Sequence, residues 1–160
     1  MYLNKILFSI VLALFLSINS FANELFILPK QKKEVLNHIE NLILDSKKEI
    51  KIAVYNFSYK RLAKPLLIAS KNGIKVTVYF DESKIKEEDE LYKEFKKNGI
   101  KTIIIKEKLH TKLAIFDNKT AYFGSANWTK KSFNENYEIL YFTNEKQTIQ
   151  RLNNFLSTLN

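Results

Sequence analysis

Apolar side chains recur at intervals that alternate between helical and strand spacing from residue 24 to the end of the chain. Intervals of three and four residues predict amphipathic helices, whereas β-branched and aromatic runs predict strands. The predicted elements are a helix over residues 30–46, a strand over 50–57, a helix over 58–72, a strand over 74–80, a helix over 87–98, a strand over 100–105, a hairpin over 109–124, a strand over 136–142 and a final helix after 144. This order predicts an α/β domain with a mixed sheet flanked by helices on both faces.

Capping and helix-breaking residues support several of these boundaries. Ser58 and Asn144 are suited to cap the helices that follow them. Gly73 and Gly99 are suited to end the helices that precede them, and Pro65 is expected to kink the start of its helix. The last helix has an apolar face made of Ile149, Leu152, Leu156 and Leu159.

The first 22 residues have the pattern of a secretory signal peptide. Lys5 precedes an apolar run over residues 6–18, and Ser20 and Ala22 provide the small residues of a cleavage site. The run is short for a membrane span, and an uncleaved N-terminal anchor is the alternative. We therefore expect an exported protein, periplasmic or attached to a membrane or the cell surface, with one domain over residues 23–160.

The chain is strongly basic, with a formal net charge of +9 that falls to +8 without Lys5, the one charged residue of the signal peptide. Lysine and arginine bind phosphates of nucleic acids regardless of base sequence, and an anionic membrane attracts the same charge. A lysine-rich composition is also typical of AT-rich genomes, so charge alone indicates only an acidic partner. Cysteine is absent, which excludes disulfides and thiolate metal sites.

The segment with the clearest chemical pattern is Leu109-His110-Thr111-Lys112, followed by Asp117 and then by Gly124-Ser125-Ala126-Asn127-Trp128. Side chains at i and i+2 share a face of a strand, so His110 and Lys112 are expected to project together. A two-residue loop at Asn118-Lys119 would pair Lys112 with Ser125 and His110 with Asn127. In this arrangement Gly124 leaves room for a ligand beside the backbone.

An imidazole, an ammonium, a hydroxyl and a carboxamide that converge are suited to phosphoryl transfer. Imidazole can attack phosphorus or protonate a leaving oxygen near neutral pH, while lysine and asparagine stabilise charge on the other phosphate oxygens. The second histidine, His38, lies within a predicted helix and is interpreted as a surface or boundary residue. The sequence contains no acidic cluster that would hold a metal.

The pattern His110-x-Lys112-x4-Asp117, then Gly124-Ser125-x-Asn127, resembles the HKD motif of the phospholipase D superfamily, in particular that of its small single-motif bacterial endonucleases. Asn136-x-Glu138 resembles the next element of that family. The strand, helix and strand over residues 52–81 resemble the segment that precedes the motif. The resemblance covers about residues 48–143.

The resemblance implies an α-β-α sandwich and a mechanism that uses two facing motifs. Because this chain has one copy, the resemblance implies a homodimer with the site at a two-fold axis. One His110 would form a phosphohistidine, and the other would protonate the leaving group and then activate water. Lys112 and Asn127 would hold the phosphate with support from Ser125, and Glu138 would orient the imidazole. No cofactor and no metal are implied.

The remaining candidate residues surround this motif. We assign Asp117 to holding the hairpin in place. Trp128 is a candidate for stacking on a base, with a core anchor as the alternative. The lysines that flank the motif are candidates for binding phosphates, with solvated surface residues as the alternative, and they are Lys106, Lys108, Lys130 and Lys131.

Three functions remain open at this point. The first is an exported endonuclease of low sequence specificity that acts on DNA, with RNA as a further candidate substrate. The second is a phosphodiesterase that cleaves phospholipids of the cardiolipin type. The third is a nucleic-acid-binding module without catalytic activity.

Overall fold

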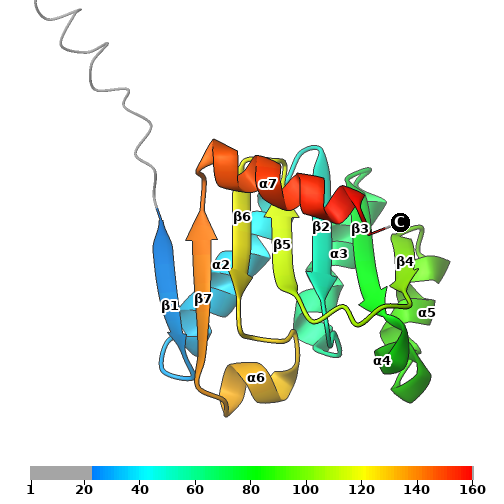
Figure 1. Cartoon of the computed structure of the whole chain (residues 1–160), viewed down its shortest axis with the longest axis horizontal. Helices are drawn as coiled ribbons and strands as arrows, with labels where there is room; N and C mark the ends of the chain where they lie inside the picture. Colours follow the sequence, from blue (N-terminus) through cyan, green and yellow to red (C-terminus); the bar gives the residue numbers. More distant parts are fainter. Residues whose placement is uncertain (1–22, 160) are drawn as a thin grey trace, which may run out of the picture.

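Seven strands form one mixed sheet in the computed structural model, which describes residues 23–159 (Figure 1). The strands are β1 (Glu24–Leu28), β2 (Glu49–Val54), β3 (Lys75–Asp81), β4 (Lys101–Ile105), β5 (Lys112–Phe116), β6 (Thr120–Gly124) and β7 (Glu138–Thr143). Their order across the sheet is β1-β7-β6-β5-β2-β3-β4. β2, β3 and β4 run parallel, and the remaining neighbours are antiparallel. The predicted α/β class with a mixed sheet is confirmed.

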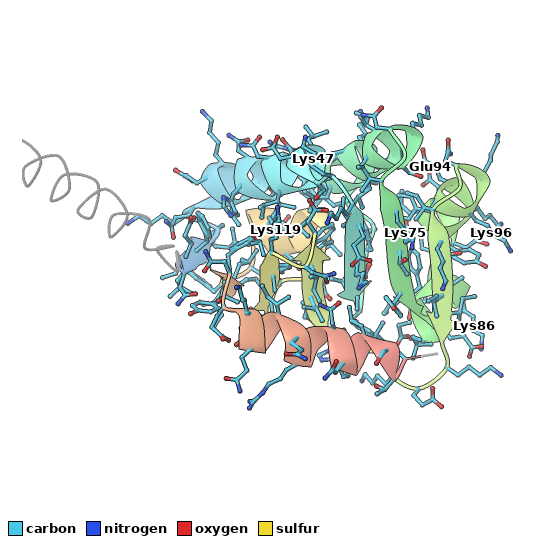
Figure 2. All side chains as sticks on the ribbon, turned by 90° about the horizontal axis from the view of Figure 1, so that it is seen from above. Lys47, Lys75, Lys86, Glu94, Lys96 and Lys119 are labelled. Carbon is cyan, nitrogen blue, oxygen red and sulfur yellow. The ribbon has the colours of Figure 1, made fainter. Side chains whose placement is uncertain are left out.

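Helices cover both faces of this sheet. They are α2 (Lys32–Asp45), α3 (Lys60–Lys71), α4 (Glu82–Glu87), α5 (Glu90–Lys97), α6 (Lys130–Asn134) and α7 (Lys146–Ser157). Figure 2 shows α7 on one face and α2 and α3 on the other. Two apolar clusters result, because Ile50, Ile52 and Phe142 pack toward α2 and α3, whereas Ile115 of β5 belongs to a second cluster with Ile149 and Leu156 of α7. No helix among residues 23–159 is both long and apolar enough to span a membrane.

Several elements differ from the sequence prediction. β1, α4 and α6 were not predicted, and the helix expected over residues 87–98 is α5, which is shorter at both ends. β1 pairs with β7, which lies more than 100 residues away in the sequence, so the local pattern of apolar residues does not indicate this pairing. α6 has five residues, too few to show helical periodicity. The N-caps of α3 and α7 are Tyr59 and Glu145, each one residue after the predicted cap.

The hairpin between β5 and β6 has a different register from the predicted one. Phe116 pairs with Thr120 and Leu113 with Phe123, so three residues form the turn instead of two. Asp117 and Asn118 have positive φ angles of 52° and 54°. Both residue types tolerate this left-handed conformation, which makes the longer turn accessible. The expected pairing of Lys112 with Ser125 is therefore wrong by one residue.

The signal peptide predicted over residues 1–22 lies outside the described residues.

Candidate active site

All candidate residues except Asp117 lie at one end of the sheet, the end at the bottom of Figure 1. β2 and β3 end here, and β5 and β7 begin here, because β5 is antiparallel to β2 and β7 is antiparallel to β6. The loop before β5, the loop after β6 and helix α6 all lie at this end. The ends of several strands thus bring segments that are distant in the sequence close together.

His110 belongs to the loop before β5 and not to the strand itself, which begins at Lys112. The loop is fixed by Asp81, whose carboxylate accepts a hydrogen bond of 2.8 Å from the backbone N–H of the buried Leu109. His110 is exposed, and its ring centroid lies 4.9 Å from that of Tyr55. Within residues 23–159 no hydrogen bond engages the imidazole, so both ring nitrogens remain accessible to a substrate.

Lys112 is 9% exposed, and its ammonium donates a hydrogen bond of 3.0 Å to the carbonyl oxygen of His110. The ammonium also lies 5.4 Å from the centroid of the Tyr55 ring. Burial lowers the pKa of Lys112 below its ordinary value, the charge of Glu138 opposes this shift, and the charge of Lys108 adds to it. A partly desolvated ammonium gains more from an incoming phosphate than a solvated one.

The loop after β6 is attached to the segment that follows β2. Trp128 and Asn56 share a backbone hydrogen bond of 3.0 Å, and the backbone N–H groups of Ser58 and Tyr59 both donate to the carbonyl of Trp128. The Asn127 carboxamide oxygen accepts from the backbone N–H of Asn56 at 3.3 Å. Tyr55 contacts His110, so the adjacent residues Tyr55 and Asn56 connect the two halves of the motif.

Ser125 and Glu138 form the third part of the site. The Ser125 hydroxyl donates to the Glu138 carboxylate and accepts from the backbone N–H of Ile139 at 3.1 Å. The amide of Asn136 donates to the other carboxylate oxygen at 3.1 Å. The expected hydrogen bond from His110 to Glu138 does not occur among the described residues. Glu138 acts on the site in this structure through its charge on Lys112.

Two sequence interpretations need correction. Trp128 is fully buried, with its ring 5.0 Å from that of Phe57 in a T-shaped arrangement, so it anchors the core and offers no surface to a base. Gly124 does not leave room for a ligand. A Cβ atom there would overlap the carbonyl oxygen of Ile139, so the glycine permits β6 and β7 to approach each other.

Asp117 lies at the opposite end of β5 from Lys112. Its carboxylate accepts hydrogen bonds of 2.7, 2.8 and 3.0 Å from the backbone N–H groups of Lys47, Lys48 and Glu49. Burial alone would raise the pKa of Asp117, but these hydrogen bonds outweigh burial and the pKa lies below its ordinary value. Asp117 thus ties the hairpin to β2, in keeping with its assignment from the sequence.

Comparisons with known proteins agree with this architecture. The sequence profile of the family described as "cardiolipin synthase, PLD-like domain" matches residues 39–159. The chain belongs to this phospholipase D-like family. No curated protein sequence matches it significantly.

The chain is similar in structure to small phospholipase D-like proteins. NucT from Helicobacter pylori superposes with a TM-score of 0.80 and 29% identity, over 88% of this chain and 96% of that one. Nuc from Salmonella typhimurium, a phospholipase D family member, has a TM-score of 0.80 and 22% identity, over 88% and 94%. Polyphosphate kinase from Porphyromonas gingivalis matches with a TM-score of 0.70 and 15% identity, over 86% of this chain and 26% of that one, and shares the fold alone.

Sequence reasoning missed Tyr55 and Asn56 in this phospholipase D-like site. Both lie near the carboxyl end of the strand predicted over residues 50–57 and just beyond the end of β2 at Val54, and ligands in α/β sheets bind beyond the carboxyl ends of strands. Their position at the end of this strand was the feature of the sequence that could have identified them. Among the residues that the structure describes, no group of three or more His, Asp or Glu side chains is arranged to hold a metal ion.

The flanking lysines are all exposed at this end of the sheet. Lys106 and Lys108 lie in the loop before β5, and Lys130 and Lys131 begin α6. None of the four forms an ion pair within residues 23–159, whereas Lys60, Lys84 and Lys86 do. Their charges are therefore available to an anionic substrate.

Proposed function

We propose that this chain is an exported, metal-independent endonuclease that cleaves DNA, and also RNA, through a phosphohistidine formed on His110 in a homodimer. The observation that carries the proposal is an accessible imidazole beside a buried ammonium without an ion-pair partner among the described residues. The chain has the phosphodiesterase fold of the phospholipase D superfamily, which supports the same chemistry.

The chemistry needs two imidazoles in different roles. One His110 attacks phosphorus, the bond to the leaving oxygen breaks, and the second His110 donates a proton to that oxygen. The second imidazole then takes a proton from water, whose oxygen displaces the first histidine and regenerates it. Lys112 and Asn127 stabilise the charge on the phosphate oxygens during both steps.

An exposed apolar surface beside the site supports a dimer. Leu25, Ile27 and Ile139 are about half exposed (55%, 51% and 55%), and Tyr137 is 92% exposed. Leu25 and Ile27 are on β1, next to Ile139 on β7, which directly follows Glu138. A second copy of the chain that covers this surface would remove it from water and bring a second His110 toward the first.

The substrate class is supported by charge. The chain carries a net charge of +9, and lysines that form no ion pair within residues 23–159 flank the motif on both sides. Polynucleotides present closely spaced phosphates to such a surface.

Cleavage assays would test this function directly. The protein without residues 1–22 would be incubated with plasmid DNA, single-stranded DNA, RNA and cardiolipin vesicles, in excess EDTA, beside the His110→Ala variant. The proposal expects nucleic acids to be cleaved by the wild type alone and to remain substrates under chelation. Complete loss of activity in EDTA, restored by one divalent metal, would contradict the mechanism. Binding of DNA without any cleavage would instead favour a catalytically idle module.

Hydrolysis of cardiolipin-type phospholipids is the second candidate function. The observation in its favour is the apolar surface of Leu25, Ile27, Tyr137 and Ile139 next to the site, which would also suit acyl chains. Cleavage of the vesicles with intact nucleic acids would establish this alternative.

The dimer has a test of its own. Wild type would be refolded together with increasing proportions of His110→Ala, and subunit exchange would be verified separately. Activity should fall as the square of the wild-type fraction, because only wild-type dimers hold two imidazoles. A linear decrease would mean that each chain carries a complete site.

A further inference from the structure

The aromatic ring of Tyr55 is the centre of a cluster of cations. The ammonium groups of Lys84, Lys112 and Lys108 lie 5.1, 5.4 and 5.9 Å from its centroid, and the His110 ring lies 4.9 Å away. Cations attract the negative face of an aromatic ring, which partly offsets their mutual repulsion. Repulsion remains, since the charge of Lys108 contributes to the lowered pKa of Lys112.

A pocket of about 310 Å³ opens beside this ring, and neither His110 nor Lys112 is among its lining residues. Its lining includes Tyr55, Ser83, Lys106 and Lys108. Tyr55 thus lines the pocket and also contacts His110.

Two carboxylates also line the pocket, but each is already engaged. Asp81 accepts hydrogen bonds from the backbone N–H groups of Leu109 and Ser83, and Glu82 forms an ion pair of 2.8 Å with Lys86. Lys106 and Lys108 have no ion-pair partner within residues 23–159. The lining therefore contains three lysines and two carboxylates, and the excess positive charge lies on Lys106 and Lys108.

We propose that this pocket binds the phosphate next to the scissile phosphate of a polynucleotide. The proposal rests on the function proposed above. It explains why Lys106 and Lys108, which form no ion pair within residues 23–159, line a pocket at the ring that contacts His110. Lysine side chains bind phosphate as mobile point charges, and a neighbouring phosphate is the anion that a polynucleotide substrate always supplies.

The test compares substrates that differ by one phosphate. Steady-state kinetics would be measured with the dithymidine diester TpT, with its 5′-phosphorylated and 3′-phosphorylated forms, and with bis(4-nitrophenyl) phosphate. A charge-assisted contact should raise kcat/KM for one of the phosphorylated forms about tenfold over TpT. In a Lys106→Gln, Lys108→Gln variant this ratio should fall toward one.

Lys75→Gln is the matched control, because Lys75 is an exposed lysine at the start of β3, and this strand starts at the opposite end of the sheet from α6 (Figure 1). It should retain the wild-type ratio. If TpT is hydrolysed but neither terminal phosphate increases kcat/KM, the subsite does not exist while the phosphodiesterase function stands. A preference that survives in the double variant also overturns the assignment to this pocket. If no diester is hydrolysed, both proposals are wrong.

Discussion

The two ends of β5 carry the two ends of the same short motif. They differ in how many hydrogen bonds the protein makes to the polar side chains there. At the start of β5, the imidazole of His110 has no hydrogen bond within residues 23–159, and the buried ammonium of Lys112 is met by a carbonyl and an aromatic ring. At the end of β5, the carboxylate of Asp117 is satisfied by three backbone N–H groups.

This difference separates reactive groups from structural ones. A group whose hydrogen bonds are all made within the protein stabilises the fold but has little left to offer a substrate. A group that is held in place with some of its hydrogen bonds unmade contributes less to the stability of the fold, but it can still bind a substrate or react with it. The motif therefore combines a reactive end with a structural end, and substitutions at the two ends should affect different quantities.

The largest effect is expected for His110→Ala. Removal of both the nucleophile and the general acid should lower kcat by about 10⁴-fold or more. The melting temperature should remain close to that of the wild type, because the ring is exposed and makes no hydrogen bond among the described residues. Rates with bis(4-nitrophenyl) phosphate and a thermal melt would measure both quantities. Full activity in this variant would remove His110 from the mechanism.

Lys112→Met should lower kcat by about 10²- to 10³-fold, the usual cost of losing a group that stabilises developing charge. Methionine has a similar length and suits the buried position, so the fold should be retained or slightly stabilised. Comparison of kcat and KM would show whether the loss occurs mainly in the transition state. A change in KM alone would mean that Lys112 only binds the substrate.

Glu138→Gln should have a smaller effect with a distinctive dependence on pH. The charge of Glu138 raises the pKa of Lys112 against the lowering caused by burial, so removal of that charge lowers the pKa further. The cationic form of Lys112 is lost as pH rises through its pKa. The basic limb of the pH profile of kcat/KM should therefore move to lower pH. A basic limb at the wild-type position would show that this limb does not report Lys112.

Asp117→Asn should leave kcat unchanged and lower the free energy of unfolding by about 1–2 kcal/mol at neutral pH. The pKa of Asp117 is lowered in the folded state, so its contribution is complete above the pKa of the unfolded state and is lost as pH falls through the folded pKa. The stability difference between the two proteins should thus shrink in acid. Urea unfolding at several pH values would measure it, and a loss of kcat in a folded variant would contradict the division between the two ends.

The sequence predicted the layered fold and the motif because both depend on local patterns. Apolar periodicity indicated six of the seven strands as separate runs or hairpin arms, and the spacing of His110, Lys112, Ser125 and Asn127 indicated one site. The features that it missed depend on contacts between distant segments. The pairing of β1 with β7, the attachment of Trp128 to Asn56, and the contact of Tyr55 with His110 all join residues more than 50 positions apart.

Two errors came from residues that suit more than one environment. Asp117 and Asn118 adopt positive φ angles, which adds a residue to the turn and shifts the register. Gly124 suited either ligand access or close strand packing, and only the position of the Ile139 carbonyl distinguishes the two. Backbone conformation at such positions is set by the assembled sheet.

The stereochemistry at phosphorus tests the covalent role of His110 most directly. The substrate would be a dinucleotide with a single phosphorothioate diester of known configuration, hydrolysed in water enriched in ¹⁸O. Attack by His110 followed by attack of water comprises two displacements that each invert phosphorus, so the account predicts net retention. Net inversion would mean that water attacks the diester directly, and the phosphohistidine mechanism would then be wrong.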